Sequence, residues 1–334
     1  MIFLATKWHV LDLPNISRKI HDKPIPLLGG VAIYLAFLLS IGFFWQTGNL
    51  FDSRINIGLV AWFLLASLIL IVNGFFDDKY KLPPQISIIG PIISVAIVIL
   101  AGLKITYVSN PFGGIFYMDN ILAPGSFWSL AIPIFITFFW LMGMTYTTKL
   151  LDGIDGLASS IGLIASVIIF FVSLSWDVSG STTSLLSATL AGSILGFLVF
   201  NWHPAKIFLG EGGSTFIGFA LGVLAIISGS KIATALLVMG FPALDILWVI
   251  VRRLKNKQPI YQGDNEHLHF RLMRAGLSQK QTVLFMGFIS LCFGLVSILF
   301  TTKAKIGALF IVMALMFLLS SWLNYKLKEK HEAK

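Results

Sequence analysis

Long apolar stretches separated by short polar ones run through almost the whole chain, and they limit the possible folds more than any other feature. Each stretch has roughly the ~20 residues that an α-helix needs to cross a bilayer. Hydrophobic residues make up 57% of the sequence and charged residues 12%, which is far more apolar than a soluble domain. We therefore predict an all-α fold, a polytopic membrane helix bundle with about ten transmembrane helices. The predicted spans are residues 28–47, 57–76, 85–103, 127–147, 157–176, 184–202, 214–228, 232–251, 282–300 and 305–323.

The spacing of these stretches gives the domain organisation. We expect residues 1–334 to form a single integral membrane domain that ends in a charged cytoplasmic tail at 324–334. The stretch at 214–228 is short, and the next one begins at Ile232. These two spans are therefore predicted to form a tight hairpin around Gly229, where glycine tolerates the turn.

The lysines and arginines favour one orientation in the membrane. With the N-terminus in the cytoplasm, the loops and termini on that side hold 19 of the 24 Lys and Arg residues, in agreement with the positive-inside rule. The sequence therefore predicts a multi-pass protein of the cell membrane (inner or plasma membrane). Because the basic residues are spread over many loops, no nucleic-acid binding is expected. The single cysteine, Cys292, excludes an intramolecular disulfide.

The polar side chains that could take part in catalysis or ligand binding all fall on the predicted cytoplasmic side. They follow the second, fourth, sixth and eighth spans, and the outer loops carry nothing comparable. Ionisable groups at membrane depth are costly and usually functional, so this distribution predicts one active site on the cytoplasmic face. The four clusters are Asp77-Asp78, Asp152 with Asp155, Glu211 among glycines, and His267 with His269.

Clustered carboxylates without cysteine favour a hard cation, and magnesium usually binds through one or two carboxylates plus substrate phosphates. Asp77 and Asp78 are adjacent, so their charges repel unless a cation or a shared proton intervenes. Asp152 and Asp155 are three apart and would share one face of a helical turn. The alternative for the second pair is a solvated loop between two spans. His267 and His269 lack a clear third ligand, so structural zinc is not expected.

Two further segments permit both a functional and a structural interpretation. Residues 210–215 resemble a glycine-rich turn at a helix N-terminus, which suits phosphate, but glycines before a membrane helix are common. The basic loop with Arg252 and Arg253 could contact substrate or act only as a positive-inside anchor. Asp245, inside a span after Pro242, is expected to have a structural role.

The motifs taken together resemble the polyprenyl-phosphate N-acetylhexosamine-1-phosphate transferase family, from about Val10 to Leu277. Each motif is moderate alone, but seven occur in family order on one predicted membrane face. The resemblance rests on Pro14-Asn15 with Arg18, Lys19, His21, Pro24, Pro26 and Gly29-Gly30; Phe76-Asp77-Asp78; Asp152-Gly153-Ile154-Asp155-Gly156; Asn201 with Pro204-Ala205-Lys206; Phe208-Leu209-Gly210-Glu211-Gly212-Gly213-Ser214; Pro242 and Asp245 with Arg252-Arg253; and Asp264 with His267-Leu268-His269.

The resemblance implies a function. An enzyme of this kind transfers N-acetylhexosamine-1-phosphate, here expected to be GlcNAc-1-phosphate, from a UDP-sugar to polyprenyl (undecaprenyl) phosphate and releases UMP. Such products start cell-wall and surface-glycan lipid intermediates. Mg²⁺ is the implied cofactor, with Mn²⁺ as a substitute, and a homodimer is a further expectation. We prefer direct attack by the lipid phosphate over a covalent intermediate.

The family motifs also imply roles for individual residues of this sequence. The catalytic group comprises Asp77, Asp78, His267 and His269. The substrate-binding group comprises His21, Lys149, Asp152, Asp155, Asn201, Arg252 and Arg253. The predicted metal ligands are Asp77, Asp78, Asp152 and Glu211.

The sequence departs from the family pattern at several positions. Lys149 and Tyr146 stand where asparagines are usual, and Glu211 stands where the family usually has a magnesium-ligating aspartate. A lysine could contact phosphate, but it would also compete with the metal for the carboxylates. Gln85 replaces a common lysine and Phe270 a third histidine. The family usually has another span before the Pro14 loop, and the sequence shows none there.

Two other functions compete with this one. The phospho-N-acetylmuramoyl-pentapeptide transferase branch is the close rival, but its histidine motif is typically a run of consecutive histidines. A secondary transporter would place its acids near the bilayer midplane, often in two repeated halves. Residues 28–156 and 157–281 show no such repeat, and the acids lie at the ends of spans.

Overall fold

A computed structural model describes residues 1–14, 23–48, 57–110, 113–122, 125–176, 181–229, 231–259, 266–300 and 302–332. Helices dominate the described residues, and nine of them are long and apolar enough to cross a membrane. The predicted all-α membrane bundle is therefore confirmed. The long helices are α2 (Gly29–Gln46), α3 (Ile57–Tyr80), α6 (Ala131–Leu151), α7 (Leu157–Trp176), α8 (Thr182–Asn201), α9 (Gly210–Ile227), α10 (Ile232–Lys255), α12 (Gln279–Leu299) and α13 (Thr302–Glu332).

The tenth predicted span forms a shorter, broken helix. Residues 85–103 contribute to α4 (Pro84–Ser87) and α5 (Ile89–Leu100), which are separated at Ile88. The break has a local cause, because Pro91 has no N–H and its ring clashes with the carbonyl four residues earlier, that of Ser87. The count of about ten crossings thus consists of nine long helices and this interrupted one among the described residues.

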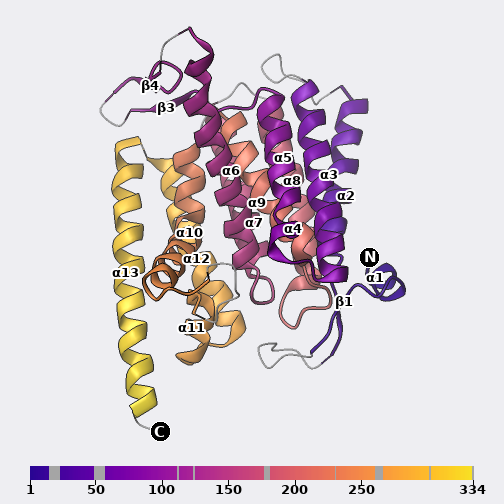
Figure 1. Cartoon of the computed structure of the whole chain (residues 1–334), viewed down its shortest axis with the longest axis vertical. Helices are drawn as coiled ribbons and strands as arrows, with labels where there is room; N and C mark the ends of the chain where they lie inside the picture. The colour runs from indigo at the N-terminus through magenta and orange to yellow at the C-terminus, as the bar shows by residue number, and fades with distance from the viewer. Residues whose placement is uncertain are drawn as a thin grey trace.

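Two small two-stranded sheets and several short helices lie at the ends of the bundle. The strand β1 (Leu11–Asp12) pairs with β2 (Ile25–Pro26), and β3 (Tyr107–Ser109) pairs with β4 (Ile115–Tyr117), both antiparallel. The short helices are α1 (Ile2–Lys7), η1 (Phe127–Leu130) and α11 (Leu268–Arg274). In Figure 1 both termini and α11 lie toward the lower end, whereas the β3–β4 hairpin lies at the upper end.

Helix α9 is the centre of the bundle and packs against α6, α3 and α2. Its glycines permit unusually close helix contacts, as small residues do between membrane helices. A Cβ atom at Gly74 of α3 would lie 2.0 Å from the backbone nitrogen of Gly212, and one at Gly30 of α2 would lie 2.2 Å from that of Gly213. Two of the glycines after Glu211 are therefore explained by packing.

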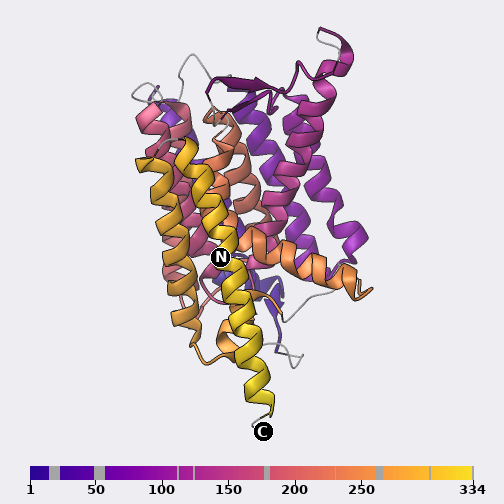
Figure 2. The same ribbon diagram turned by 90° about the vertical axis from the view of Figure 1, so that its left-hand side faces the viewer.

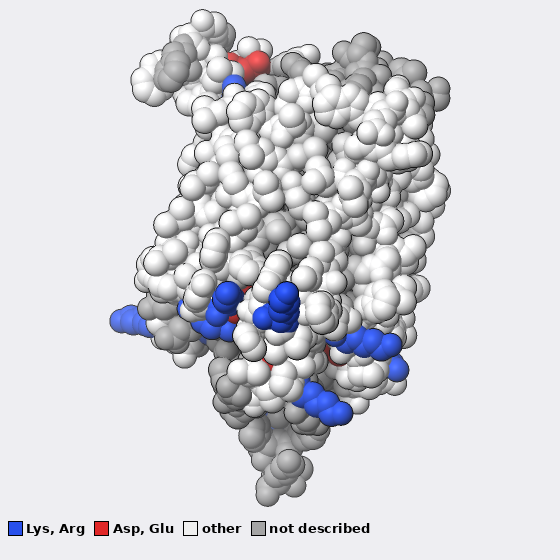
Figure 3. Space-filling view, turned by 90° about the vertical axis from the view of Figure 1, so that its right-hand side faces the viewer, with Lys and Arg blue, Asp and Glu red and all other residues white. Residues whose placement is uncertain are grey.

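The other elements complete the predicted arrangement. Helices α9 and α10 form the expected hairpin, with Gly229 in the left-handed region at φ 79°. Helix α13 continues from Asn324 to Glu332 and reaches below the rest of the bundle (Figure 2). In Figure 3, uncharged residues cover the middle of one face, and Lys and Arg side chains gather mainly toward its lower end.

Candidate active site

A cavity of about 840 Å³ lies at the lower end of the bundle, where α3 and α6 end and α9 begins. Three of the four polar clusters that were predicted to form one site contribute to its wall and therefore meet at one end of the bundle. The fourth cluster, with His267 and His269, is not part of the lining. The ionisable residues of the lining are Asp12, Lys23, Asp78, Lys81, Lys149, Asp152, Asp155, His203, Lys206 and Glu211.

Asp78 fixes the start of the central helix. Its side chain is buried, and its Oδ2 accepts a hydrogen bond from the backbone N–H of Glu211 at 3.0 Å. This N–H has no partner within α9, so the carboxylate satisfies it and complements the positive end of the helix. Gly210 has φ 74°, and a Cβ there would lie 2.5 Å from the carboxylate. The sequence suggested that the backbone amides of this turn bind phosphate, but the amide of Glu211 already donates its hydrogen bond to Asp78.

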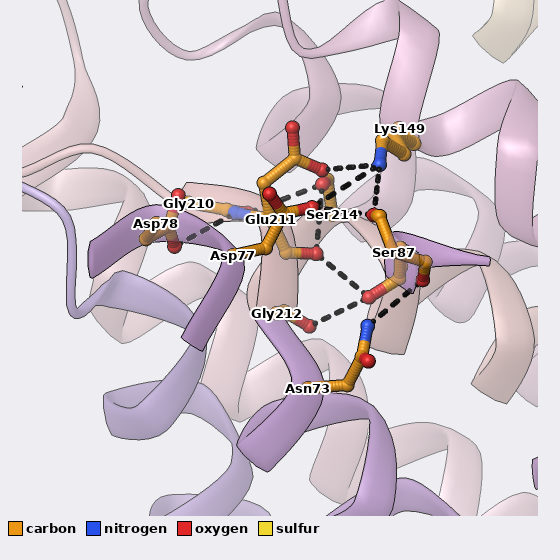
Figure 4. A network of polar contacts seen from close by, with 10 residues as sticks. Asn73, Asp77, Asp78, Ser87, Lys149, Gly210, Glu211, Gly212 and Ser214 are labelled. Carbon is orange, nitrogen blue, oxygen red and sulfur yellow. Dashed lines mark hydrogen bonds and ion pairs between the residues drawn. The ribbon is translucent and has the colours of Figure 1, made fainter. Parts of the chain in front are cut away.

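Asp77 belongs to a second network on the other side of the same turn (Figure 4). The Ser87 hydroxyl donates a hydrogen bond to Asp77 Oδ2, and the backbone carbonyl of Ser87 accepts one from Asn73 at 3.0 Å. Asn73 and Asp77 are one helical turn apart in α3, so together they hold the end of α4 against it. The interrupted span therefore delivers Ser87 to the acidic cluster.

The Lys149 ammonium lies among these groups (Figure 4). Its Nζ is 2.9 Å from Glu211 Oε2 and 3.8 Å from Asp77 Oδ2, and it donates a hydrogen bond to Ser87 Oγ at 3.2 Å. Two residues that depart from the family pattern, one at the end of α6 and one at the start of α9, thus form an ion pair with each other. This contact was not foreseen from the sequence, because the two positions are far apart in the chain.

The predicted magnesium ligands do not fit a magnesium ion in this arrangement. No group of three or more His, Cys, Asp and Glu side chains among the described residues is placed to hold a metal. Asp78 bonds a backbone amide, and Asp77 and Glu211 both face the Lys149 ammonium. Near a protein surface, a unit positive charge about 4 Å away raises the free energy of each positive charge on a bound cation by roughly 4 kcal/mol. The magnesium site therefore stays a prediction that this geometry does not favour.

The loop between α6 and α7 is pinned by the segment after α8. Asp155 Oδ2 lies 2.7 Å from His203 Nδ1 and accepts the Ala205 backbone N–H at 3.1 Å. Asn201 Oδ1 accepts hydrogen bonds from Gly156 N at 3.1 Å and from Ser159 Oγ at 2.9 Å. Asn201 and Asp155 line the cavity, but these bonds also give both side chains a role in holding the loop. Their substrate-binding role stays a prediction.

Asp152 follows α6 and points toward the same cavity. Burial, and then the carboxylates of Glu211 and Asp155, raise the pKa of Asp152 from 3.8 to about 8. A carboxyl whose pKa is higher in the folded than in the unfolded chain costs stability as the pH rises between the two values. This cost is absent at acid pH and complete above the folded-state pKa.

We therefore expect Asp152→Asn to raise the melting temperature by an amount that grows from about pH 5 to about pH 9, since the variant has no charge to form. Thermal unfolding of detergent-purified protein across this pH range, with chelator present, measures the difference. Asp119→Asn, which makes the same chemical change in the loop after β4 at the other end of the bundle, is the control. A flat difference for Asp152→Asn would contradict the raised pKa.

The histidine motif is attached to α10 and touches the loop after α6. Asp245 Oδ2 lies 3.0 Å from His267 Nδ1, and its Oδ1 accepts the Leu268 backbone N–H at 3.0 Å. The expected structural role of Asp245 is thus supported. His269 is buried beside Gly153, where a Cβ would lie 2.3 Å from its Nε2. Burial, and then His267, lower the pKa of His269 to about 3, so its ring is neutral near pH 7.

Two predicted substrate-binding residues, Arg252 and Arg253, lie outside the cavity lining. Arg252 forms an ion pair with Glu266 at 3.2 Å, and Arg253 Nη1 donates a hydrogen bond to the Pro259 carbonyl at 2.6 Å. Neither arginine belongs to the cavity lining, and both hold the loop after α10. These contacts with Glu266 and Pro259 occupy the two guanidinium groups away from the cavity. His21 lies outside the described residues.

A family profile described as Glycosyl transferase family 4 matches residues 60–229. A Bacillus subtilis protein named "Probable undecaprenyl-phosphate N-acetylglucosaminyl 1-phosphate transferase" is 33% identical over 323 residues, covering 93% of this chain and 83% of its own. The chain belongs to glycosyl transferase family 4. The family expected from the motifs is therefore confirmed, and with it the assignment as a membrane transferase.

Two other relatives of this family 4 chain come from Mycobacterium leprae and Thermotoga maritima. A Mycobacterium leprae protein named "Decaprenyl-phosphate N-acetylglucosaminephosphotransferase" is 29% identical over 332 residues, covering 91% of this chain and 81% of its own. A Thermotoga maritima protein named "Undecaprenyl-phosphate alpha-N-acetylglucosaminyl 1-phosphate transferase" is 28% identical over 295 residues, covering 88% and 83%. The similarity thus extends over nearly the whole chain.

Several residues of the family 4 site were missed from the sequence. His203 precedes Pro204 within a polar segment between spans, and that position was a usable signal for a partner of Asp155. Ser87 stands in an apolar run and gives no local signal of its contact with Asp77. Lys81, directly after α3, also lines the cavity, although a lysine at the end of a span is usual on the basis of topology alone.

The contacts of Asp245 predict that it positions the histidine motif of this family 4 chain. Asp245→Ala should lower the transfer rate by about 10²-fold, because His267 loses its partner and small misplacements near a reacting centre have such effects. Asp245→Asn keeps an acceptor for Leu268 N–H and should recover part of the rate. Initial rates, with the melting temperature as a folding control, test this. Equal rates for wild type and a folded Asp245→Ala would contradict it.

Proposed function

We propose that this chain transfers N-acetylglucosamine-1-phosphate from UDP-N-acetylglucosamine to a polyprenyl phosphate of the undecaprenyl type and releases UMP. The cavity at the end of the bundle is the observation that carries the proposal. Its volume of about 840 Å³ is in the range of small-molecule sites, and it lies where a membrane-bound lipid phosphate and a soluble nucleotide can meet. The printed names of the three relatives support the N-acetylglucosamine branch over the muramoyl-pentapeptide alternative.

The proposed reaction is a direct displacement at phosphorus. An oxygen of the lipid phosphate forms a bond to the phosphorus that carries the sugar, and the bond from this phosphorus to the bridging oxygen breaks. UMP leaves with the electron pair. A phosphate monoester has a second pKa near 6, so the lipid phosphate is largely a dianion near neutral pH and needs no strong base. Such a reaction depends on positioning and charge neutralisation.

The residues that line the cavity can supply both the positioning and the charge neutralisation that the reaction needs. Four lysines face the cavity, and their charges would offset those of the lipid phosphate and the diphosphate. Asp77 and Asp78 are engaged by Ser87 and by the Glu211 amide, which supports direct attack over a covalent aspartyl intermediate. The lysines of the lining are Lys23, Lys81, Lys149 and Lys206.

The proposal also includes the side of the membrane. Lys and Arg side chains gather toward the end that holds the cavity (Figure 3), and basic residues favour the cytoplasmic side. The nucleotide donor would therefore enter from the cytoplasm, and the isoprenoid chain would lie along the apolar helix surface. The expected homodimer stays a prediction.

An assay of purified protein in detergent tests the proposed function. Polyprenyl phosphate is mixed with one UDP-sugar at a time, and UMP release and sugar label in the organic phase are followed. UDP-N-acetylglucosamine should give both signals, whereas UDP-N-acetylmuramoyl-pentapeptide should give neither. Label in the organic phase only with the muramoyl donor would move the chain to the alternative branch. No transfer with any donor, while a related active enzyme works, would contradict the proposal and favour the transporter.

A further inference from the structure

Lys149 lies in the middle of the groups that the sequence assigns to a metal. Glu211 and Asp77 approach its ammonium at 2.9 and 3.8 Å, and Ser87 Oγ accepts a hydrogen bond from it at 3.2 Å. The Tyr146 ring adds a cation–π contact at 5.7 Å. These contacts come from α3, α4, α6 and α9, so the ammonium is held at one place by four converging elements (Figure 4).

The two residues of the ion pair are matched to each other. Lys149 brings a positive charge to a position where the sequence pattern predicts asparagine, and Glu211 brings a side chain one methylene longer than the predicted aspartate. Glutamate starts from the first turn of α9 and reaches the end of α6, where its Oε2 meets Nζ. Each substitution alone would leave a partly buried charge without this partner, which is costly.

The ammonium also remains available to the cavity. Lys149 and Glu211 both line it, and the Lys149 side chain is 20% exposed. A lysine ammonium carries three donors, and the polar contacts of this one with the chain are the hydrogen bond to Ser87 and the ion pairs with Glu211 and Asp77. A phosphate oxygen entering the cavity can therefore approach the same positive charge.

We propose that the Lys149 ammonium takes the place of a divalent cation between Asp77 and Glu211, and that it neutralises the diphosphate of the donor as a built-in cation. The inference rests on the proposed function and specifies how its charge is balanced. It replaces the magnesium site expected from the resemblance with a residue of the chain itself. The reaction still balances as a displacement of UMP by the lipid phosphate, because the ammonium is neither consumed nor deprotonated.

Binding of Mn²⁺ alone, measured by electron paramagnetic resonance on detergent-purified protein without nucleotide or lipid, tests the cation site. Wild type and Lys149→Arg keep the positive charge and should bind Mn²⁺ weakly. Lys149→Asn should bind it at least about tenfold more tightly, because a positive charge within about 4 Å of the ion is removed. Adding Glu211→Gln to Lys149→Asn should abolish this gain.

Equal Mn²⁺ affinity in wild type and Lys149→Asn, whether both tight or both weak, would overturn the inference. Melting temperatures identify any variant that has failed to fold, and in that case Lys149→Met replaces Lys149→Asn. Transfer by the wild-type chain should continue in excess chelator, and its loss there would also overturn the inference. Absence of transfer with and without Mg²⁺ would instead remove the proposed function, while the Mn²⁺ comparison would still decide the occupant of the site.

Discussion

Asp78→Asn is expected to lower the transfer rate by about 10²- to 10³-fold while the protein remains folded in the membrane. The loss of a preorganised group of this kind has an effect of that size in other enzymes. Asp78 lines the cavity, and its carboxylate accepts a hydrogen bond from the Glu211 N–H in the first turn of α9 at 3.0 Å. Asparagine keeps a carbonyl oxygen for this hydrogen bond but removes the charge. The substitution therefore separates the electrostatic role of Asp78 from its role as a helix cap.

Initial rates of UMP release at saturating donor, together with melting temperatures, measure this effect. Asp119→Asn serves as the matched control, since it makes the same chemical change in the loop after β4 at the opposite end of the bundle and should leave the rate unchanged. Asp78→Ala also removes the acceptor and should lower the melting temperature as well as the rate. A folded Asp78→Asn with the wild-type rate would remove Asp78 from the proposed site.

Gly74→Ala is expected to destabilise the bundle by about 3 kcal/mol or more, at the upper end of the effects of overpacking. A Cβ at this position would lie 2.0 Å from the backbone nitrogen and 2.1 Å from the Cα of Gly212. Backbone atoms cannot turn aside as a flexible side chain can, so α3 and α9 must move apart. Since Asp78 lies one turn beyond Gly74 in α3 and Glu211 directly precedes Gly212 in α9, the site should open as well.

Thermal unfolding followed by tryptophan fluorescence measures this prediction, with an expected fall in melting temperature of roughly 10 °C. The control is Gly143→Ala in α6, where a Cβ would meet nothing within 4 Å. Both substitutions gain similar helix propensity, so their difference isolates the contact with α9. If Gly74→Ala were as stable as Gly143→Ala, the close packing of α3 on α9 would be wrong.

The parts of the architecture that were predictable depend on local or additive properties of the sequence. Spans such as α7 and α12 follow from apolar stretches of the required length, because the bilayer imposes one dimension on all of them. The Asp78, Asp152 and Glu211 clusters were expected to meet because each follows an even-numbered span, and even-numbered spans end on the same side of the membrane. The break before α5 was less visible, because its cause is the single Pro91 within an otherwise apolar stretch.

The detailed contacts of the site could not be predicted because they depend on how distant helices pack. Lys149 and Glu211 were recognised as two separate departures from the family pattern, and only the approach of α6 to α9 shows that they form an ion pair. Arg252 was an equally reasonable substrate ligand in the sequence, but it forms an ion pair with Glu266 instead. Tertiary contacts, rather than residue types, decide these roles.

The fate of the phosphorus atom attached to the sugar tests the central claim most directly. UDP-N-acetylglucosamine labelled at this phosphorus is mixed with polyprenyl phosphate and the purified chain, and the label is followed into the organic and aqueous phases. Phosphosugar transfer predicts that the label enters the lipid together with the sugar and that unlabelled UMP is released. Sugar in the lipid with the phosphorus label left in aqueous UDP would contradict the account, because only the sugar would then have moved.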